Sequence, residues 1–141
     1  MTKLTVITQI TAPVAVVWHK WTNEEEITKW NFASDDWCCP MATNDLKVDG
    51  EFSTRMEAKD GSFGFDFVGV YTEVTPLKSI AYSLGDKREV QITFSEKDGV
   101  TTVVETFDPE NENPLEMQQA GWQAIMDNFK AHVLSSMSQA D

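Results

Sequence analysis

Residues 113–135 read NPLEMQQAGWQAIMDNFKAHVLS, and this stretch decides the fold. Its apolar and amphipathic positions recur at steps of three, four and seven, which is the spacing of one helix face. They are Leu115, Gln118, Trp122, Ile125, Phe129 and Val133. Asn113 suits the N-cap and Pro114 the first turn. A helix from Pro114 to Ser135 would span roughly 33 Å at about 1.5 Å per residue, and it must bury its apolar face across a sheet.

The sheet is predicted by the alternating stretches that precede this helix. The clearest is a long strand on which Phe63, Phe65, Phe67, Gly69 and Tyr71 share one face before Pro76 ends it. The other strands of this segment are expected at residues 45–48, 52–57, 79–84, 89–95 and 100–107. Asp-Gly turns at 49–50, 60–61 and 98–99 join several of them. Tight turns between successive strands indicate an antiparallel meander.

The N-terminal segment predicts one more strand and two short helices. Residues 3–10 alternate as a strand, and Pro13 fits the first turn of a helix. Asn23 followed by Glu26 has the pattern of an N-cap with a reciprocal glutamate, so a second short helix is expected there. Residues 31–44 show no clear period and are expected to form an apolar loop.

The predicted order is strand, two short helices, about six strands and one long helix. The packing that suits this order is an α+β fold, in which a curved antiparallel sheet of six or seven strands wraps around the C-terminal helix. No internal repeat or Gly/Ser linker interrupts residues 1–141, so a single domain is expected. A chain of 141 residues is long enough to bury a core without disulfides.

Composition and charge argue against several classes of function. Eleven basic against twenty-three acidic residues give a net charge of −12, whereas nucleic acids and anionic membranes require clustered Lys and Arg. No apolar run approaches the ~20 residues of a membrane-spanning helix. The two cysteines, Cys38 and Cys39, are adjacent, so no disulfide framework is expected and the cytoplasm is the expected compartment.

A series of motifs along the chain resembles a known superfamily. In sequence order they are Ile10-Thr11-Ala12-Pro13 with Val17-Trp18, Trp21-Thr22-Asn23-Glu24 leading to Trp30, Val48-Asp49-Gly50-Glu51-Phe52, Asp60-Gly61, Phe67-Val68-Gly69-Val70-Tyr71 with Glu73-Val74-Thr75-Pro76, Gly99-Val100-Thr101-Thr102-Val103, and Gly121-Trp122. The chain resembles the START-like (SRPBCC, helix-grip) superfamily, in the branch related to the C-terminal domain of the activator of the heat-shock-protein-90 ATPase. The resemblance implies a cavity between sheet and helix. It implies no single activity, because the superfamily includes lipid carriers, hormone receptors, cyclases and co-chaperones.

Aromatic and Met side chains on the expected strands and C-terminal helix are candidates for the wall of such a cavity, because small-molecule sites are mostly apolar with a few polar groups. The candidate ligand-binding residues are Trp37, Phe52, Phe65, Phe67, Tyr82, Phe94, Trp122, Met126 and Phe129. The alternative for each is an ordinary packed core. The function that this pattern favours is non-catalytic binding of a small hydrophobic or aromatic molecule.

Two other functions stay open. One is regulation of a chaperone ATPase by protein contact, which is what the named relatives of the resemblance do. The other is a polyketide cyclase or dehydratase, which needs an acid or base buried in the cavity. Tyr82, Asp35 and Asp36 are the candidates that the sequence offers for that role.

The histidines, cysteines and acidic clusters are expected to have structural roles. No cofactor, metal or catalytic residue is predicted. His19 and His132 do not stand at ligand spacing to the cysteines, which are expected in an aromatic loop beside Trp37. Two acidic clusters are expected to be solvated or to cap helices. They are Glu24, Glu25, Glu26, Asp35 and Asp36, and Glu105, Asp108, Glu110, Glu112 and Glu116.

Overall fold

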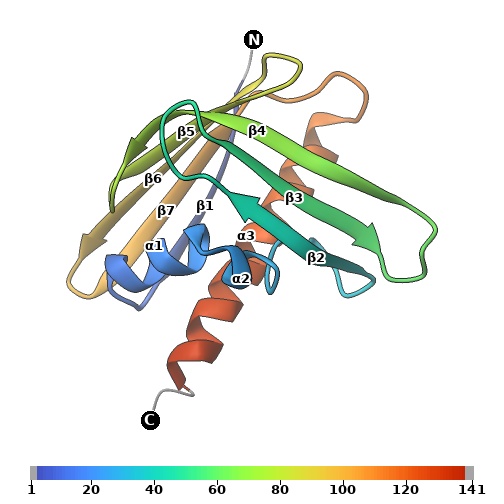
Figure 1. Cartoon of the computed structure of the whole chain (residues 1–141). Helices are drawn as coiled ribbons and strands as arrows, with labels where there is room; N and C mark the ends of the chain where they lie inside the picture. The colour runs from blue at the N-terminus through green and yellow to red at the C-terminus, as the bar shows by residue number, and fades with distance from the viewer. Residues whose placement is uncertain (1–2, 139–141) are drawn as a thin grey trace.

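The computed structural model describes residues 3–138 as one antiparallel sheet curled around a long helix (Figure 1). The elements in chain order are β1 (Leu4–Ile10), α1 (Val14–Thr22), α2 (Glu24–Ile27), β2 (Trp37–Asn44), β3 (Glu51–Ala58), β4 (Gly64–Thr75), β5 (Ser79–Leu84), β6 (Glu89–Lys97), β7 (Val100–Phe107) and α3 (Leu115–Ser138). The seven strands lie in the order β1-β7-β6-β5-β4-β3-β2. The predicted helix-grip α+β architecture is confirmed.

Helix α3 crosses the concave face and also covers the edge strand β1. The side-chain amides of Gln119 and Gln123 donate to the backbone oxygens of Thr5 and Ile7, at 3.0 and 3.1 Å. An uncovered edge strand presents unpaired backbone groups that invite pairing with another chain. The helix therefore closes one edge of the sheet while its other face packs on the interior. Leu115, predicted for the inner face, is 46% exposed at the start of the helix.

The segment 31–44 is where the predicted secondary structure is wrong. Trp37–Asn44 forms strand β2, which pairs with β3, instead of an apolar loop. A shift in register between Cys38 and Met41 interrupts the alternation, and Pro40 falls inside this irregular stretch of an edge strand. The residues 45–48, predicted as a strand, belong to the connection between β2 and β3.

That connection needs a glycine at its end. A Cβ atom on Gly50 would lie 2.1 Å from the backbone oxygen of Asp45, so no larger residue fits without moving the backbone. Asp49 has a φ angle of 70° in the left-handed region. The Asp-Gly pair therefore marks a turn, as predicted, but the turn belongs to a longer connection than a two-residue hairpin.

Helices α1 and α2 lie beside α3 at one end of the sheet (Figure 1). The predicted N-cap of α2 is confirmed, because the Asn23 side chain accepts a hydrogen bond from the Glu26 backbone N–H at 3.1 Å. The reciprocal role predicted for the Glu26 side chain is wrong. Its carboxylate instead contacts Lys20 of α1 and His132 of α3, at 2.9 and 2.8 Å. One carboxylate thus joins the three helices.

The fully buried core lies where these helices meet β1, β6 and β7. Its largest completely buried members include Ile10, Val17, Ile92, Met126 and Phe129. The rings of Trp21 and Trp30 lie 4.9 and 4.7 Å from that of Phe129, which closes this end of the molecule. No helix among residues 3–138 is long and apolar enough to cross a membrane.

Candidate functional site

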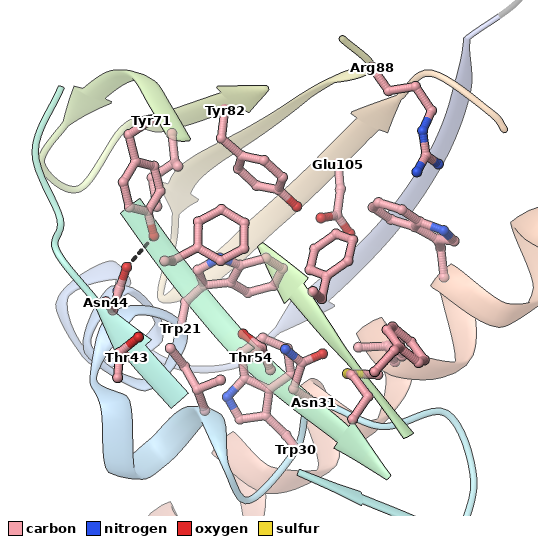
Figure 2. A pocket seen from close by; sticks show the side chains of 18 of the residues that line it. Trp21, Trp30, Asn31, Thr43, Asn44, Thr54, Tyr71, Tyr82, Arg88 and Glu105 are labelled. Carbon is pink, nitrogen blue, oxygen red and sulfur yellow. Dashed lines mark hydrogen bonds between the residues drawn. The ribbon is translucent and has the colours of Figure 1, made fainter. Parts of the chain in front are cut away.

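A cavity of about 560 Å³ lies between the concave face of the sheet and α3 (Figure 2). Its volume falls within the range of small-molecule sites, which is roughly 300 to 1,000 Å³. Its wall is formed by Trp21, Ile27, Trp30, Asn31, Thr43, Asn44, Phe52, Thr54, Met56, Phe63, Phe65, Phe67, Tyr71, Ile80, Tyr82, Arg88, Glu105, Glu110, Glu112, Trp122 and Ile125. Strands β2 to β5 and β7 contribute most of these side chains.

The centre of the wall is a group of aromatic rings in mutual contact. Phe52 lies 4.7 Å from Tyr82 and 5.9 Å from Phe67, measured between ring centroids. Phe67 in turn lies 6.3 Å from Trp122, whose indole stacks on Phe107 at 3.8 Å. These edge and stacked contacts fix the rings before any ligand enters. The structure therefore presents a preformed aromatic surface.

Gly69 of β4 makes room for this arrangement. A Cβ atom at Gly69 would lie 2.5 Å from the ring of Phe52. Phe52 is paired with Gly69 in the β3–β4 register, so the ring lies over the glycine of its own cross-strand partner. The absence of a side chain on β4 thus sets the position of one wall of the cavity.

The nine predicted ligand-binding residues separate into two groups. Phe52, Phe65, Phe67, Tyr82 and Trp122 line the cavity. Phe94, Met126 and Phe129 lie in the closed core, and Trp37 lies beside Phe63 and Phe65. The role of all nine as ligand contacts stays a prediction. The wall also includes residues that the prediction does not contain, among them Trp21, Trp30 and Tyr71.

Glu105 is the candidate functional residue that sequence reasoning missed. It is predicted to belong to a solvated acidic cluster, and this is wrong, because its exposed fraction is only 7%. Burial raises the pKa of its carboxyl to about 8. The available signal was its parity on β7, where Thr101, Val103 and Phe107 alternate with it and are all buried. Glu105 is thus a buried acid in the cavity, of the kind that the cyclase alternative requires.

Two tyrosines complete the polar part of the wall. The Tyr71 hydroxyl donates to the side-chain oxygen of Asn44 (Figure 2). Tyr82 is 8% exposed, and its hydroxyl points into the cavity on the same side as the Glu105 carboxyl (Figure 2). Burial, with the nearby charge of Glu105, raises the pKa of Tyr82 well above its usual value. Both hydroxyls therefore stay protonated at neutral pH.

Charged side chains lie where the β5–β6 turn and the β7–α3 loop reach the cavity. Arg88 donates from Nε to Asp86 at 2.6 Å. Glu110 and Glu112 add negative charge to the same wall. Gln118 of α3 holds their loop, because its side-chain amide donates to the backbone oxygens of Glu110 and Asn113 at 3.0 and 2.8 Å. The surroundings of this end of the cavity are therefore net acidic.

The cysteines and histidines lie away from this wall. Burial raises the pKa of Cys39 to about 11, so its thiol stays protonated and unreactive at neutral pH. His132 contacts Glu26 in the helix cluster. Among the described residues, no group of three or more His, Cys, Asp or Glu side chains is arranged to hold a metal ion.

A curled seven-stranded sheet, a long C-terminal helix across it and a cavity between them define a START-like protein of the helix-grip class. Residues 11–133 match the family model described as "Activator of Hsp90 ATPase homolog 1-like protein". The chain belongs to this family.

Solved structures agree with this assignment. The chain is similar to the AHSA1-like protein from Aeromonas hydrophila, with 39% identity, a TM-score of 0.92 and coverage of 99% of this chain and 97% of that one. It is also similar to Chr148 from Cytophaga hutchinsonii, with 45% identity, a TM-score of 0.82 and coverage of 99% and 96%. NE0264 from Nitrosomonas europaea, at 19% identity, a TM-score of 0.82 and 96% coverage of both chains, shares the fold. No curated protein matches the sequence.

Proposed function

We propose that this protein binds a small hydrophobic or aromatic molecule, without catalysis, in the cavity between the sheet and α3. The observation that carries the proposal is the preformed aromatic wall of a cavity of about 560 Å³. Covering about 300 Å² of apolar ligand surface would contribute on the order of 7 kcal/mol before association costs, which suits micromolar affinity.

The test is a thermal-shift and heteronuclear-NMR screen with fatty acids, flavonoids and aromatic polyketides. A ligand in the cavity should shift resonances of inner-face residues on β3 to β5 and on α3, in a saturable way. Binding to the native state alone also raises the unfolding midpoint as the ligand concentration increases. No saturable shift at millimolar concentrations of any class would contradict the proposal.

Phe67→Ala should separate binding from stability. Phe67 lines the cavity and is partly buried, so its loss should weaken a bound ligand about ten-fold or more. Trp18→Ala is the matched control, because Trp18 packs on Phe94 outside the cavity wall, at 5.1 Å between ring centroids. The control should lower the unfolding midpoint and leave the ligand Kd unchanged, as measured by titration of tryptophan fluorescence. Equal loss of affinity in both variants would place the ligand elsewhere.

The family description favours a second candidate, which is contact with a chaperone ATPase. The net charge of −12 would suit a basic surface on such a partner. An ATPase assay of heat-shock protein 90 with added chain, together with gel filtration of the mixture, tests this candidate. An unchanged rate and no complex would reject it.

A further inference from the structure

Two polar side chains end in the cavity without a partner among the described residues. Glu105 and Tyr82 are 7% and 8% exposed, so each is more than nine-tenths buried. Neither the Glu105 carboxyl nor the Tyr82 hydroxyl makes a hydrogen bond to a residue of the described chain. Both side chains point from the sheet into the same part of the cavity (Figure 2). Among the described residues no completely buried side-chain N or O atom lacks a hydrogen-bond partner, so the oxygens of Glu105 and Tyr82 are open to the cavity. A ligand that displaces water from the cavity must therefore pair with them, because leaving them unpaired is costly.

The sheet itself cannot supply that partner. Glu105 lies on β7 and Tyr82 on β5, with β6 between them. The cross-strand neighbours on β6 are Ile92 beside Glu105 and Val90 beside Tyr82, and both are apolar. Phe52 packs against the Tyr82 ring from the other side. The two polar groups are therefore directed at the space that a ligand would occupy.

Both groups are hydrogen-bond donors in the folded protein. Burial keeps the pKa of Glu105 at about 8 and that of Tyr82 well above its usual value, so each carries its proton at neutral pH. A protonated carboxyl and a tyrosine hydroxyl that point into the same part of a cavity suit a carbonyl oxygen between them. The pair therefore calls for an acceptor atom on the ligand.

The charges around the cavity indicate whether the acceptor atom of the ligand is neutral or negatively charged. Glu110 and Glu112 lie on the wall, and Arg88 is already paired with Asp86. A carboxylate ligand would meet this acidic surrounding, whereas a neutral carbonyl compound would not.

Resting on the proposed function, we infer that Glu105 and Tyr82 together bind the carbonyl oxygen of a neutral aromatic ketone. The aromatic body of the ketone lies against Phe52, Phe67 and Trp122, and its oxygen accepts from the carboxyl and the phenol.

Three probes of the same shape test this inference: 2-acetylnaphthalene, 2-isopropylnaphthalene and 1-(2-naphthyl)ethylamine. They present a carbonyl, a methyl group and an ammonium at the same position. The measured quantity is the ratio of the Kd of the hydrocarbon to that of the ketone, in the wild type and in variants. Glu105→Leu and Tyr82→Phe should each lower this ratio about five-fold, as expected for one hydrogen bond. Glu105→Gln, whose amide N–H still donates, should keep the ratio within about two-fold of wild type.

Infrared spectroscopy of the bound ketone gives a readout that a merely structural role would not move. The carbonyl band should lie at lower frequency in the wild type than in hexane, and should move back toward the hexane value in Glu105→Leu. Thermal unfolding checks that each variant is folded.

The results of these experiments distinguish failure of this inference from failure of the proposed function. A ratio unchanged by Glu105→Leu, a carbonyl band at the hexane frequency, or tighter binding of the amine than of the ketone would overturn the inference alone. Failure of all three probes to bind saturably, while a ligand from the screen does bind, would likewise overturn the inference alone. Absence of saturable binding by the probes and by every class in the screen would overturn the proposed function and this inference together.

Discussion

At the scale of single residues, Glu105 is expected to have the largest effect on both the stability of the fold and the chemistry of the cavity. Its neighbours on β7 are apolar or small, and its carboxyl occupies the position where the alternation of the strand calls for a hydrophobic side chain. Natural proteins depart from local rules of this kind mainly at functional sites. A hydrophobic residue at position 105 would suit the fold better, whereas the carboxyl gives the cavity a polar group.

The raised pKa of Glu105 predicts an alkaline loss of stability. The pKa of the carboxyl is about 8 in the folded protein and 4.5 in the unfolded chain, so the folded state binds more protons between these values. The contribution is fully present below pH 4.5 and is lost as the pH rises through 8. The free energy of unfolding should fall by up to about 5 kcal/mol over this window.

Urea unfolding of the wild type and of Glu105→Gln at several pH values between 4.5 and 9 measures this effect. The variant should lack the decline, because its amide does not titrate. Comparison of the two profiles cancels the contribution of the histidines, which both proteins retain. Parallel profiles would show that Glu105 is not buried in the way described.

At the scale of elements, Glu26 holds three helices together. Its carboxylate contacts Lys20 on α1 and His132 on α3, and its backbone N–H donates to the side chain of Asn23, which caps α2. Burial alone would raise the pKa of Glu26, but the hydrogen bonds and charges of Lys20 and His132 outweigh burial and lower it to about 2. The ion pair is thus part of how α1 and α2 are held to α3.

Glu26→Gln should therefore destabilise the protein at neutral pH, by about 1 to 3 kcal/mol. The folded pKa lies below the unfolded value of 4.5, so the contribution is present above pH 4.5 and is lost as the pH falls toward 2. Chemical unfolding at pH 7 and pH 3 tests the sign. Glu25→Gln is the matched control, because Glu25 is exposed on the same helix. Equal effects of the two substitutions at pH 7 would contradict this role of Glu26.

At the scale of the whole molecule, the cavity divides the fold into two unequal parts. Strands β1, β6 and β7 pack with α1 and the C-terminal half of α3 into a closed core. Strands β2 to β4 face the cavity. Phe63, which directly precedes β4, and Met41 on β2 are exposed apolar side chains, at 60% and 62%. Local stability follows buried contacts, so it should be uneven across the sheet.

Native-state amide hydrogen exchange should show this division. Amides of β6 and β7 are expected to exchange only through global unfolding, and those of β2 and the outer ends of β3 and β4 through lower-energy local opening. A ligand in the cavity should raise protection on β3 and β4 more than on β1. Uniform protection across the sheet would contradict the division.

Much of the fold could be predicted because its signals are local. Alternation on β4 to β7, the Asn23 cap and the helical spacing of Trp122, Phe129 and Val133 each depend on residues a few positions apart. Strand β2 could not be predicted, because the irregularity between Cys38 and Met41 removes the period on which such a prediction depends. The capping role expected of Glu26 is wrong for a different reason. His132, more than a hundred residues away, is brought beside its carboxylate only in the folded chain.

The sequence by itself determined the order of elements, the curled sheet and the family. Periodicity, turn residues and ordered motifs each depend on residues that are close together in the sequence. Only the tertiary structure decided which part of the interior is a packed core and which part is a cavity. Phe52 and Phe129 are both aromatic residues on inner faces, yet one lines the cavity and the other fills the core. That difference arises from how the curvature of the sheet sets its distance from α3 at each end, and no residue encodes that distance alone.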